Sequence, residues 1–374
     1  MAELITRAFL KAVAVRAYQV LDFDRRRAVS NQLERLWYKI VTISFVVAMA
    51  MDPLFFYIPI IDQYNKCLRM DKKLWKISLI FRSLTDINAL VHLLYRLRLL
   101  FESFRVELGS SQVFGLVLTV VALFVTPFGI EVLALLPIPQ LLIGVDFYKI
   151  WGSGSFRQRM SITNCCLLAQ YPPRMYRIRE FKKIKKFDIK FKTMIYFGLY
   201  IFTSHVLGAL WYFFSIQREI LCWHSACVNY STDPKTCMDT FCRTIASRNI
   251  TFLNEHCSTD ILDGASSVPY NFGIYLDALK TLTVDDVKFS TKLLYCFWWG
   301  LRNISNFGTN LMTSTFVWEN VFAICISISS FLLLTFVAAT ATAGPQKEAA
   351  PGAQEDPLTV VGTNGESLSA PPII

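Results

Sequence analysis

The stretch Lys292–Asn310, KLLYCFWWGLRNISNFGTN, joins a dense apolar and aromatic run to a run of polar residues and glycine. The apolar part is shorter than the 18 or more residues that a helix needs to cross a bilayer. A helix that enters a membrane and breaks must have its freed backbone groups covered by protein or facing water. The pattern therefore predicts a re-entrant pore helix followed by an ion-selectivity filter. The alternative is an ordinary extracellular amphipathic segment.

The polar end of this stretch supplies groups that can bind a partly dehydrated cation. Gly308 permits a backbone turn that exposes carbonyl oxygens, and Thr309 and Asn310 offer neutral side-chain oxygens. These three residues are the predicted selectivity filter. The predicted supports of the pore helix are Trp298, Trp299 and Arg302.

Long apolar segments place the chain in a membrane. Apolar residues make up 53% of the 374 residues, and most of their clusters are long enough to cross a bilayer at about 1.5 Å per residue. Prolines interrupt the third cluster, and the fourth is short and polar. The six predicted spans are Trp37–Ile61, Leu74–Leu97, Val113–Leu142, Ser161–Tyr176, Lys192–Ile216 and Thr315–Ala341. We therefore expect an all-α membrane protein with six transmembrane helices and a re-entrant pore helix, the fold of voltage-gated-like channels.

Charge predicts which side of the membrane each segment faces, because cytoplasmic loops carry an excess of Lys and Arg. Residues 1–39 hold eight Lys and Arg against four Asp and Glu, which predicts a cytoplasmic N-terminus and, with six spans, a cytoplasmic C-terminus. The loop 218–286 holds five basic and nine acidic residues. It is predicted to lie outside, where its charge concentrates cations at the pore mouth. Glu319, near the outer end of the sixth helix, is predicted to add to this charge.

The outer loop also contains half of the ten cysteines, which are Cys222, Cys227, Cys237, Cys242 and Cys257. This clustering indicates an oxidising compartment and disulfides, whose connectivity the sequence leaves open. Because five is odd, one thiol stays free or pairs elsewhere. A zinc site is the rival interpretation, although paired C-x-x-C motifs do not occur. Two N-glycosylation sequons, at Asn229 and Asn249, lie in the same loop.

Charged residues in the predicted spans indicate a degraded voltage sensor. Arg174 and Arg177 follow a three-residue spacing in the fourth span, and buried cations of this kind need counter-charges. Asp86 in the second span and Glu131 in the third are the predicted counter-charges. The alternative for Asp86 is a local pair with Arg82, four residues earlier.

The fifth span contains a small-x-x-x-small pair, Ser204 and Gly208, which favours close helix packing. His205 between them is either a packing residue that forms a hydrogen bond or a proton site. The predicted domains are a cytoplasmic N-terminal arm (1–36), a four-helix voltage-sensor-like domain (37–190), a pore domain (191–341) and a disordered cytoplasmic tail (342–374). The pore domain comprises the fifth span, the Cys-rich extracellular loop (218–286), the pore helix and filter (287–311) and the sixth span (315–341).

Four motifs resemble the plant cyclic nucleotide-gated ion channels. They are MDPLFFYIPII at 51–61, SHVLGALWYFFSIQRE at 204–219, FGIYLDAL at 272–279 and FWWGLRN at 297–303. The resemblance covers about Leu33–Phe336. It implies a tetrameric cation channel of the plasma membrane that passes Ca²⁺ and K⁺ and responds to cyclic nucleotides and calmodulin.

Two departures from the family limit what the resemblance implies. The family's filter often reads Gly-Gln-Asn, where this chain has Gly-Thr-Asn, and the T-x-G-Y-G signature of strict K⁺ channels is absent. The family's nucleotide-binding and calmodulin-binding regions have no counterpart in Val337–Ile374, because this segment is too short and polar to bury such a core. We therefore expect a C-terminally truncated relative that does not bind a cyclic nucleotide by itself.

These patterns predict a non-selective cation channel subunit of the plasma membrane that passes Ca²⁺, K⁺ and Na⁺ as a homo- or hetero-tetramer. The alternative is a non-conducting subunit that dampens full-length relatives, and a secondary transporter is the third possibility. Membrane lipids and permeating cations are the expected partners, and nucleic acid is not. The sequence lacks G-x-x-x-x-G-K and H-E-x-x-H, so we expect no enzyme activity, catalytic residue, metal site or cofactor.

Overall fold

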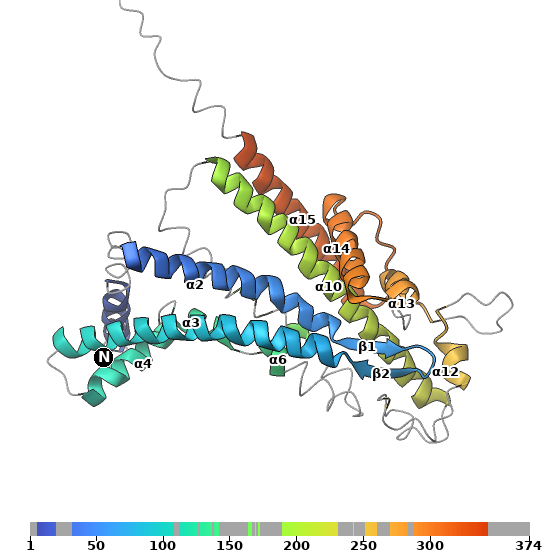
Figure 1. The fold of residues 1–374 in the computed structure, drawn as a ribbon, viewed down its shortest axis with the longest axis horizontal. Helices are drawn as coiled ribbons and strands as arrows, with labels where there is room; N and C mark the ends of the chain where they lie inside the picture. The colour runs from blue at the N-terminus through green and yellow to red at the C-terminus, as the bar shows by residue number, and fades with distance from the viewer. Residues whose placement is uncertain are drawn as a thin grey trace, which may run out of the picture.

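The computed structural model describes residues 6–19, 32–107, 112–125, 128–136, 138–141, 164–166, 169, 171–172, 189–230, 242, 251–259, 270–282 and 287–342. This part of the chain is mostly helical (Figure 1). Within it, three helices are long and apolar enough to cross a membrane: α3 (Lys72–Glu107), α10 (Ile189–Tyr230) and α15 (Val317–Thr342). The prediction of a mostly helical chain with apolar helices long enough to span a membrane is therefore confirmed, whereas the six spans and the re-entrant pore helix stay predictions.

The first predicted span is not one continuous helix, and the expectation of an all-α fold was wrong at this point. Helix α2 (Gln32–Met51) gives way to the 3₁₀ helix η1 (Asp52–Tyr57), and the antiparallel strands β1 (Pro59–Asp62) and β2 (Cys67–Met70) follow. Two prolines explain the change. Pro53 lies in the first turn of η1, and Pro59 opens β1, a strand position that needs no donated hydrogen bond.

Shorter helices complete the N-terminal half. Residues 6–19 are helical, and the third predicted span is divided into α4 (Gln112–Val125), α5 (Phe128–Leu135) and α6 (Ile138–Leu141). Helices α4 and α5 each end shortly before a proline, a residue that disfavours helical backbone at the position preceding it. The N-terminal helix packs on α3 and α4 through a small apolar core of Val13, Ala17, Leu93, Leu100, Phe104, Leu118 and Ala122.

Helices α10 and α15 run antiparallel and side by side (Figure 1). Near one end of the pair, the rings of Tyr196 and Phe336 stack at 5.7 Å. Towards the other end, Phe214 meets Phe322 edge to face at 5.1 Å. The start of α15 therefore lies beside the C-terminal half of α10.

Helix α10 continues to Tyr230, so residues 218–230 are helical and not part of an extended loop as predicted. The reason is that the helical periodicity of buried residues persists through Ile220, Trp223 and Cys227. The loop region that follows contains α12 (Thr251–His256), η4 (Gly273–Tyr275) and α13 (Leu276–Leu282).

Helix α14 (Phe289–Ser305) packs along α10. At 1.5 Å per residue its 17 residues span about 25 Å. The two helices cross closely, because a Cβ added to Gly300 would lie 2.1 Å from the carbonyl oxygen of Ser204, and one added to Gly208 would lie 2.0 Å from that of Cys296. The predicted small-residue face of α10 thus serves this contact.

Two predicted regions fall mostly outside the described residues. Of the fourth span, only residues 164–166, 169 and 171–172 are described, and of the tail, only Thr342.

Candidate functional site

Helix α14 presents one buried face and one exposed face. Cys296, Trp299 and Ile304 are buried, whereas Leu294 and Trp298 are exposed. The indole of Trp299 stacks on that of Trp211 at 4.3 Å and an interplanar angle of 6°. Helix α14 is therefore fixed to α10 through aromatic contact as well as through its glycine.

The two tryptophans predicted to support the pore helix have different environments. Trp299 is 6% exposed and packs inside the chain, whereas Trp298 is 47% exposed. The guanidinium of Arg302 lies over the Trp298 ring, 5.4 Å from its centroid. Trp211, whose Nε1 donates a 2.8 Å hydrogen bond to the carbonyl of Ile274, is a support that the sequence reasoning missed.

The chain reverses immediately after α14. Phe307 and Gly308 both have positive φ, at 57° and 72°, a conformation that glycine adopts freely and other residues rarely do. The amide of Gly308 donates to the carbonyl of Asn303 at 2.8 Å, and the amide of Leu311 donates to the carbonyl of Gly308 at 3.0 Å. The predicted turn at Gly308 is present, but its carbonyl already accepts a hydrogen bond within the chain.

The predicted filter residues beyond Gly308 are accessible. Thr309 and Asn310 are both exposed, and the Thr309 hydroxyl donates a hydrogen bond to the carbonyl of Asn306 at 3.0 Å, so its oxygen remains able to accept one. The turn is held to α15 by Ser327, whose hydroxyl donates to the carbonyl of Phe307 at 2.8 Å. Ser327 is a further residue that sequence reasoning did not identify.

The position of α14 follows from its contacts at both ends. Its last residue, Ser305, lies 2.6 Å, hydroxyl to hydroxyl, from Tyr200, inside the candidate membrane span Met194–Asn229 of α10. The segment before α14 and the start of α15 lie together beside the middle of that span, because Glu319 accepts a 2.8 Å hydrogen bond from the amide of Ile274, whose carbonyl accepts one from Trp211. The chain therefore runs along α10 as α14, turns at Gly308, and begins α15 close to the segment that precedes α14.

An open cavity of about 360 Å³ lies beside the turn. It is bordered on one side by the end of α14 and the turn, and on the other by η4 and α13. Its polar lining residues are Asp277, Lys280, Arg302, Asn303 and Asn310.

Glu319 does not contribute charge at a pore mouth, so this prediction was wrong. Its side chain is fully buried. Its Oε1 accepts hydrogen bonds from the amides of Ile274 and Ser314, and its Oε2 accepts one from the Ser314 hydroxyl. Nearby, burial raises the pKa of Tyr275 far above its usual range, and the negative charge of Glu319 adds to the effect. Glu319 therefore links η4 to the start of α15 through these hydrogen bonds.

Two disulfides between described residues lie at the end of the molecule where α10 finishes. Cys222 of α10 is bonded to Cys257, and Cys242 is bonded to Cys67 on β2. Cys227 is also disulfide-bonded. Cys242 thus pairs outside the predicted loop, with a cysteine between the first two predicted spans. The signal that could have identified Cys67 was its predicted location on the same side of the membrane. Cys237 lies outside the described residues.

The β1–β2 hairpin rests on α10. The ammonium of Lys66, in the hairpin turn, lies 3.6 Å from the carboxylate of Glu219, and both side chains are buried. The hydroxyl of Tyr212 donates to the carbonyl of Pro59 at 3.1 Å. Together with the Cys67–Cys242 disulfide, these contacts connect the N-terminal helices to α10 and the loops around it.

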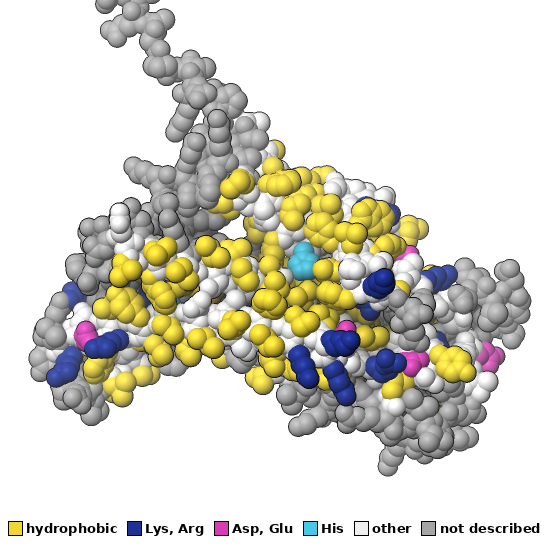
Figure 2. All heavy atoms as spheres, in the orientation of Figure 1, with side chains coloured by type: hydrophobic (Ala, Val, Ile, Leu, Met, Phe, Trp, Pro, Cys, Tyr) yellow, Lys and Arg dark blue, Asp and Glu magenta, His cyan; other side chains and the backbone are white. Residues whose placement is uncertain are grey.

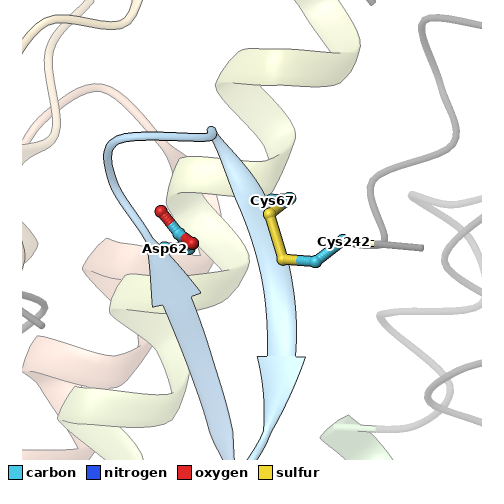
Figure 3. A group of neighbouring side chains, drawn as sticks. All are labelled: Asp62, Cys67 and Cys242. Atoms are coloured by element: carbon cyan, nitrogen blue, oxygen red, sulfur yellow. A yellow bond between two sulfur atoms is a disulfide. The ribbon is translucent and has the colours of Figure 1, made fainter. Parts of the chain in front are cut away.

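The rival zinc interpretation does not fit the cysteines near the hairpin. Asp62 lies with Cys67 and Cys242 so that their ligand atoms are within 4.8 Å of one another (Figure 3). The two sulfur atoms are joined to each other, so neither is the thiolate that zinc requires.

The predicted sensor charges are partly described. The Arg82 guanidinium lies 2.9 Å from the Asp86 carboxylate and 2.5 Å from that of Asp52. The local-pair alternative for Asp86 is therefore present, and Asp52 is a partner that the sequence reasoning missed. Glu131 lies on α5, and Arg174 and Arg177 lie outside the described residues, so their predicted pairing stays a prediction. His205 places its Nε2 3.2 Å from the carbonyl of Ala50, which suits a packing role.

The surface around these elements is strongly apolar. Hydrophobic side chains cover much of the face along α2 and α3 (Figure 2). On α15 the exposed large apolar residues are Val317, Trp318, Val321, Ile324, Ile328, Phe331, Leu332 and Phe336. Such area on helices of this length indicates contact with lipid or with other apolar surfaces.

Comparison with known proteins finds curated relatives, although no protein-family model matches the chain. The chain is 36% identical over 315 residues to Cyclic nucleotide-gated ion channel 1 of Arabidopsis thaliana, which covers 80% of this chain and 43% of the relative. It is 36% identical over 313 residues to Cyclic nucleotide-gated ion channel 11 of the same plant, covering 79% and 49%. Probable cyclic nucleotide-gated ion channel 3 is 34% identical over 319 residues, covering 80% and 44%.

This chain is a homologue of the plant cyclic nucleotide-gated ion channels. The resemblance drawn from its motifs is thereby confirmed, and with its apolar helices it identifies a membrane protein related to channels and not to enzymes. The chain spans less than half the length of the curated relatives named here.

Proposed function

We propose that the chain forms the membrane part of a non-selective cation channel subunit, with α14 as a re-entrant pore helix and Gly308–Asn310 as the selectivity filter. The observation that carries this function is the path of the chain around α14. Residues 289–305 descend beside α10, the chain turns at Gly308, and α15 starts again at the end where α14 began. Non-helical backbone at membrane depth is tolerated where it is covered by protein or faces a water-filled path.

The exposed groups of the turn suit weak binding of several cations. Thr309 and Asn310 present neutral oxygens, which replace part of a hydration shell without holding the ion as tightly as carboxylates do. One chain supplies two such side-chain oxygens, whereas Ca²⁺ takes about 6–8 oxygen ligands. A ring of four chains supplies enough oxygens, and we therefore propose a homo- or hetero-tetramer around a common axis that passes Ca²⁺, K⁺ and Na⁺.

The remaining helices complete a six-span subunit of the plasma membrane. Residues 37–190 form the four-helix sensor-like domain, with Arg174, Arg177, Asp86 and Glu131 as its charges, and residues 191–341 form the pore domain. In this arrangement α15 is the inner helix, and its exposed apolar side chains meet lipid or neighbouring subunits.

Bi-ionic current recording on Thr309→Gln tests the filter assignment. The longer side chain narrows the ring and replaces a hydroxyl with an amide, so we expect the Ca²⁺ to K⁺ permeability ratio to change several-fold. Thr281→Gln is the matched control, because Thr281 is an exposed residue of α13 that does not border the turn. Unchanged ratios in Thr309→Gln would contradict the filter assignment.

Expression of the chain alone, followed by chemical cross-linking, tests the assembly. The proposed function is supported if the chain expressed alone gives an ionic current and cross-links as a tetramer. A silent chain that suppresses the current of a co-expressed relative would instead support the regulatory alternative. Saturable uptake at low turnover would indicate a transporter.

A further inference from the structure

The C-terminal end of α10 carries an accessible modification motif. Asn229, Tyr230 and Ser231 form an N-x-S sequon, and Asn229 is an exposed residue in the last turn of the helix. The neighbouring Val228 is 58% exposed. Sequons of this type accept an oligosaccharide only on the luminal or extracellular side of the membrane.

The disulfides indicate which side this end of α10 faces. Cys222 and Cys227, which lie on α10 shortly before Asn229, are both disulfide-bonded. The Cys67–Cys242 disulfide lies on the hairpin that rests on the same part of α10. Disulfides form and persist in the lumen of the secretory pathway and outside the cell. Asn229 is therefore in the compartment where sequons are modified.

A second sequon within the described residues has a buried acceptor asparagine, whereas Asn229 is exposed. Asn303, Ile304 and Ser305 form the same motif, but Asn303 is 2% exposed and its Nδ2 donates a 2.8 Å hydrogen bond to the carbonyl of Trp299. A glycan on this nitrogen has no room beside α10. Asn249, the third acceptor, lies outside the described residues.

We propose that Asn229 is an N-glycosylation site. The donor is an oligosaccharide linked to a lipid pyrophosphate, delivered by a luminal transferase. The Asn229 amide nitrogen forms a bond to the anomeric carbon of the first sugar and loses one proton, while the bond from that carbon to the pyrophosphate breaks and the lipid pyrophosphate leaves. The glycan then projects from the end of α10 near these disulfides, and its presence does not depend on ion conduction.

The test uses the full chain expressed in eukaryotic cells and compares electrophoretic mobility before and after treatment with an amide-cleaving endoglycosidase. All variants carry Asn249→Gln, so that a remaining shift reports on Asn229. We expect the shift of one glycan in Asn249→Gln, its loss on adding Asn229→Gln or Ser231→Ala, and its retention with Ser231→Thr. Adding Asn303→Gln instead leaves the shift in place.

Thiol labelling of the same samples shows whether Cys222 and Cys257 are oxidised to a disulfide or reduced. An oxidised disulfide without a glycan in Asn249→Gln overturns the proposal, as does a shift that survives Asn229→Gln. Reduced cysteines without a glycan also overturn it, because they place this end of α10 on the wrong side. None of these results bears on the proposed selectivity filter, because the filter is tested by the permeability ratios of Thr309→Gln.

Discussion

Helices α3 and α10 are both long enough to cross a membrane, yet they bury very different shares of their apolar surface. In an apolar 18-residue stretch of α10, 61% of the residues are buried inside the chain, against 28% in such a stretch of α3. Helix α10 meets α14, α15, the hairpin and η4, and its contacts are aromatic stacks and close glycine crossings. Helix α3 contacts chiefly α2 and α4. The difference indicates that α10 is the packing centre of the described part of the chain, whereas α3 leaves much of its apolar surface uncovered by the chain.

A buried charge cluster is expected to matter most in the loosely packed half. Arg82→Met leaves Asp52, which is 1% exposed, without the guanidinium that lies 2.5 Å away. Breaking a buried ion pair from one side costs about 3–5 kcal/mol, so we expect a large loss of stability, measured by thermal unfolding in detergent micelles.

Arg98→Met is the matched control for Arg82→Met, because Arg98 lies on the same helix and pairs with Glu102 at 2.9 Å while remaining exposed. We expect no measurable change in it. Equal losses in the two variants would show that α3 is sensitive to any charge removal, and that the cluster with Asp52 has no special role.

Loss of the Cys67–Cys242 disulfide, which joins the N-terminal hairpin to the loop after α10, is expected to cause the next largest loss of stability. Removing the Cys67–Cys242 disulfide with paired serine substitutions releases a loop closed over a separation of 175 residues. Native disulfides contribute about 2–4 kcal/mol, and more for longer loops. The Cys222–Cys257 disulfide closes a separation of 35 residues within α10 and the loops beside it. Because its loop is shorter, loop entropy makes the cost of its loss smaller by roughly 1.4 kcal/mol.

Limited proteolysis distinguishes these two disulfide variants. Loss of Cys67–Cys242 should expose the hairpin and the N-terminal helices to cleavage while α10 and α14 stay protected. If both variants are cleaved alike, the two halves unfold as one cooperative unit. The contrast between α3 and α10 would then be a difference in buried surface and not in local stability.

Local patterns predicted a helix where α14 lies, because the change from aromatic to polar residues in Lys292–Asn310 marks both its apolar face and its end; its role in a pore stays a proposal. They also identified Gly208 as a close-packing position. Its partner could not be predicted, since the contact with Cys296 and Gly300 joins segments about 90 residues apart, and nothing local in either segment encodes the pairing.

The wrong prediction for Glu319 has a physical cause. A carboxylate at the start of a helix looks exposed in the sequence, and its burial depends on the amides of Ile274 and Ser314 converging on it from distant and local backbone. Asp52 was missed for the same reason, because its partner Arg82 lies 30 residues away. Whether such a polar side chain is exposed or buried depends on partners that are distant in the sequence. The periodicity of apolar residues does not reveal these partners.

The close crossing of α10 and α14 gives a prediction of intermediate size. Gly300→Ala adds one Cβ that meets the carbonyl oxygen of Ser204 at 2.1 Å, so the helices must separate. We expect a loss of about 1–3 kcal/mol, typical of overpacking. Gly198→Ala adds the same atom on α10 with nothing within 4 Å, and helix propensity then predicts a small gain. A stable Gly300→Ala variant would show that the crossing is looser than the contacts indicate.

The smallest expected effect concerns the hydroxyl that joins the turn to α15. Ser327→Ala removes the 2.8 Å hydrogen bond to the carbonyl of Phe307, which is worth about 1 kcal/mol. Ser330→Ala is the matched control, because its hydroxyl bonds the carbonyl of Ile326 within the same helix. Hydrogen exchange should accelerate at the amides of Gly308 and Leu311 in Ser327→Ala but not in Ser330→Ala. Equal exchange would mean that the turn is held by its own backbone bonds, and that α15 adds nothing to the rigidity of the proposed filter.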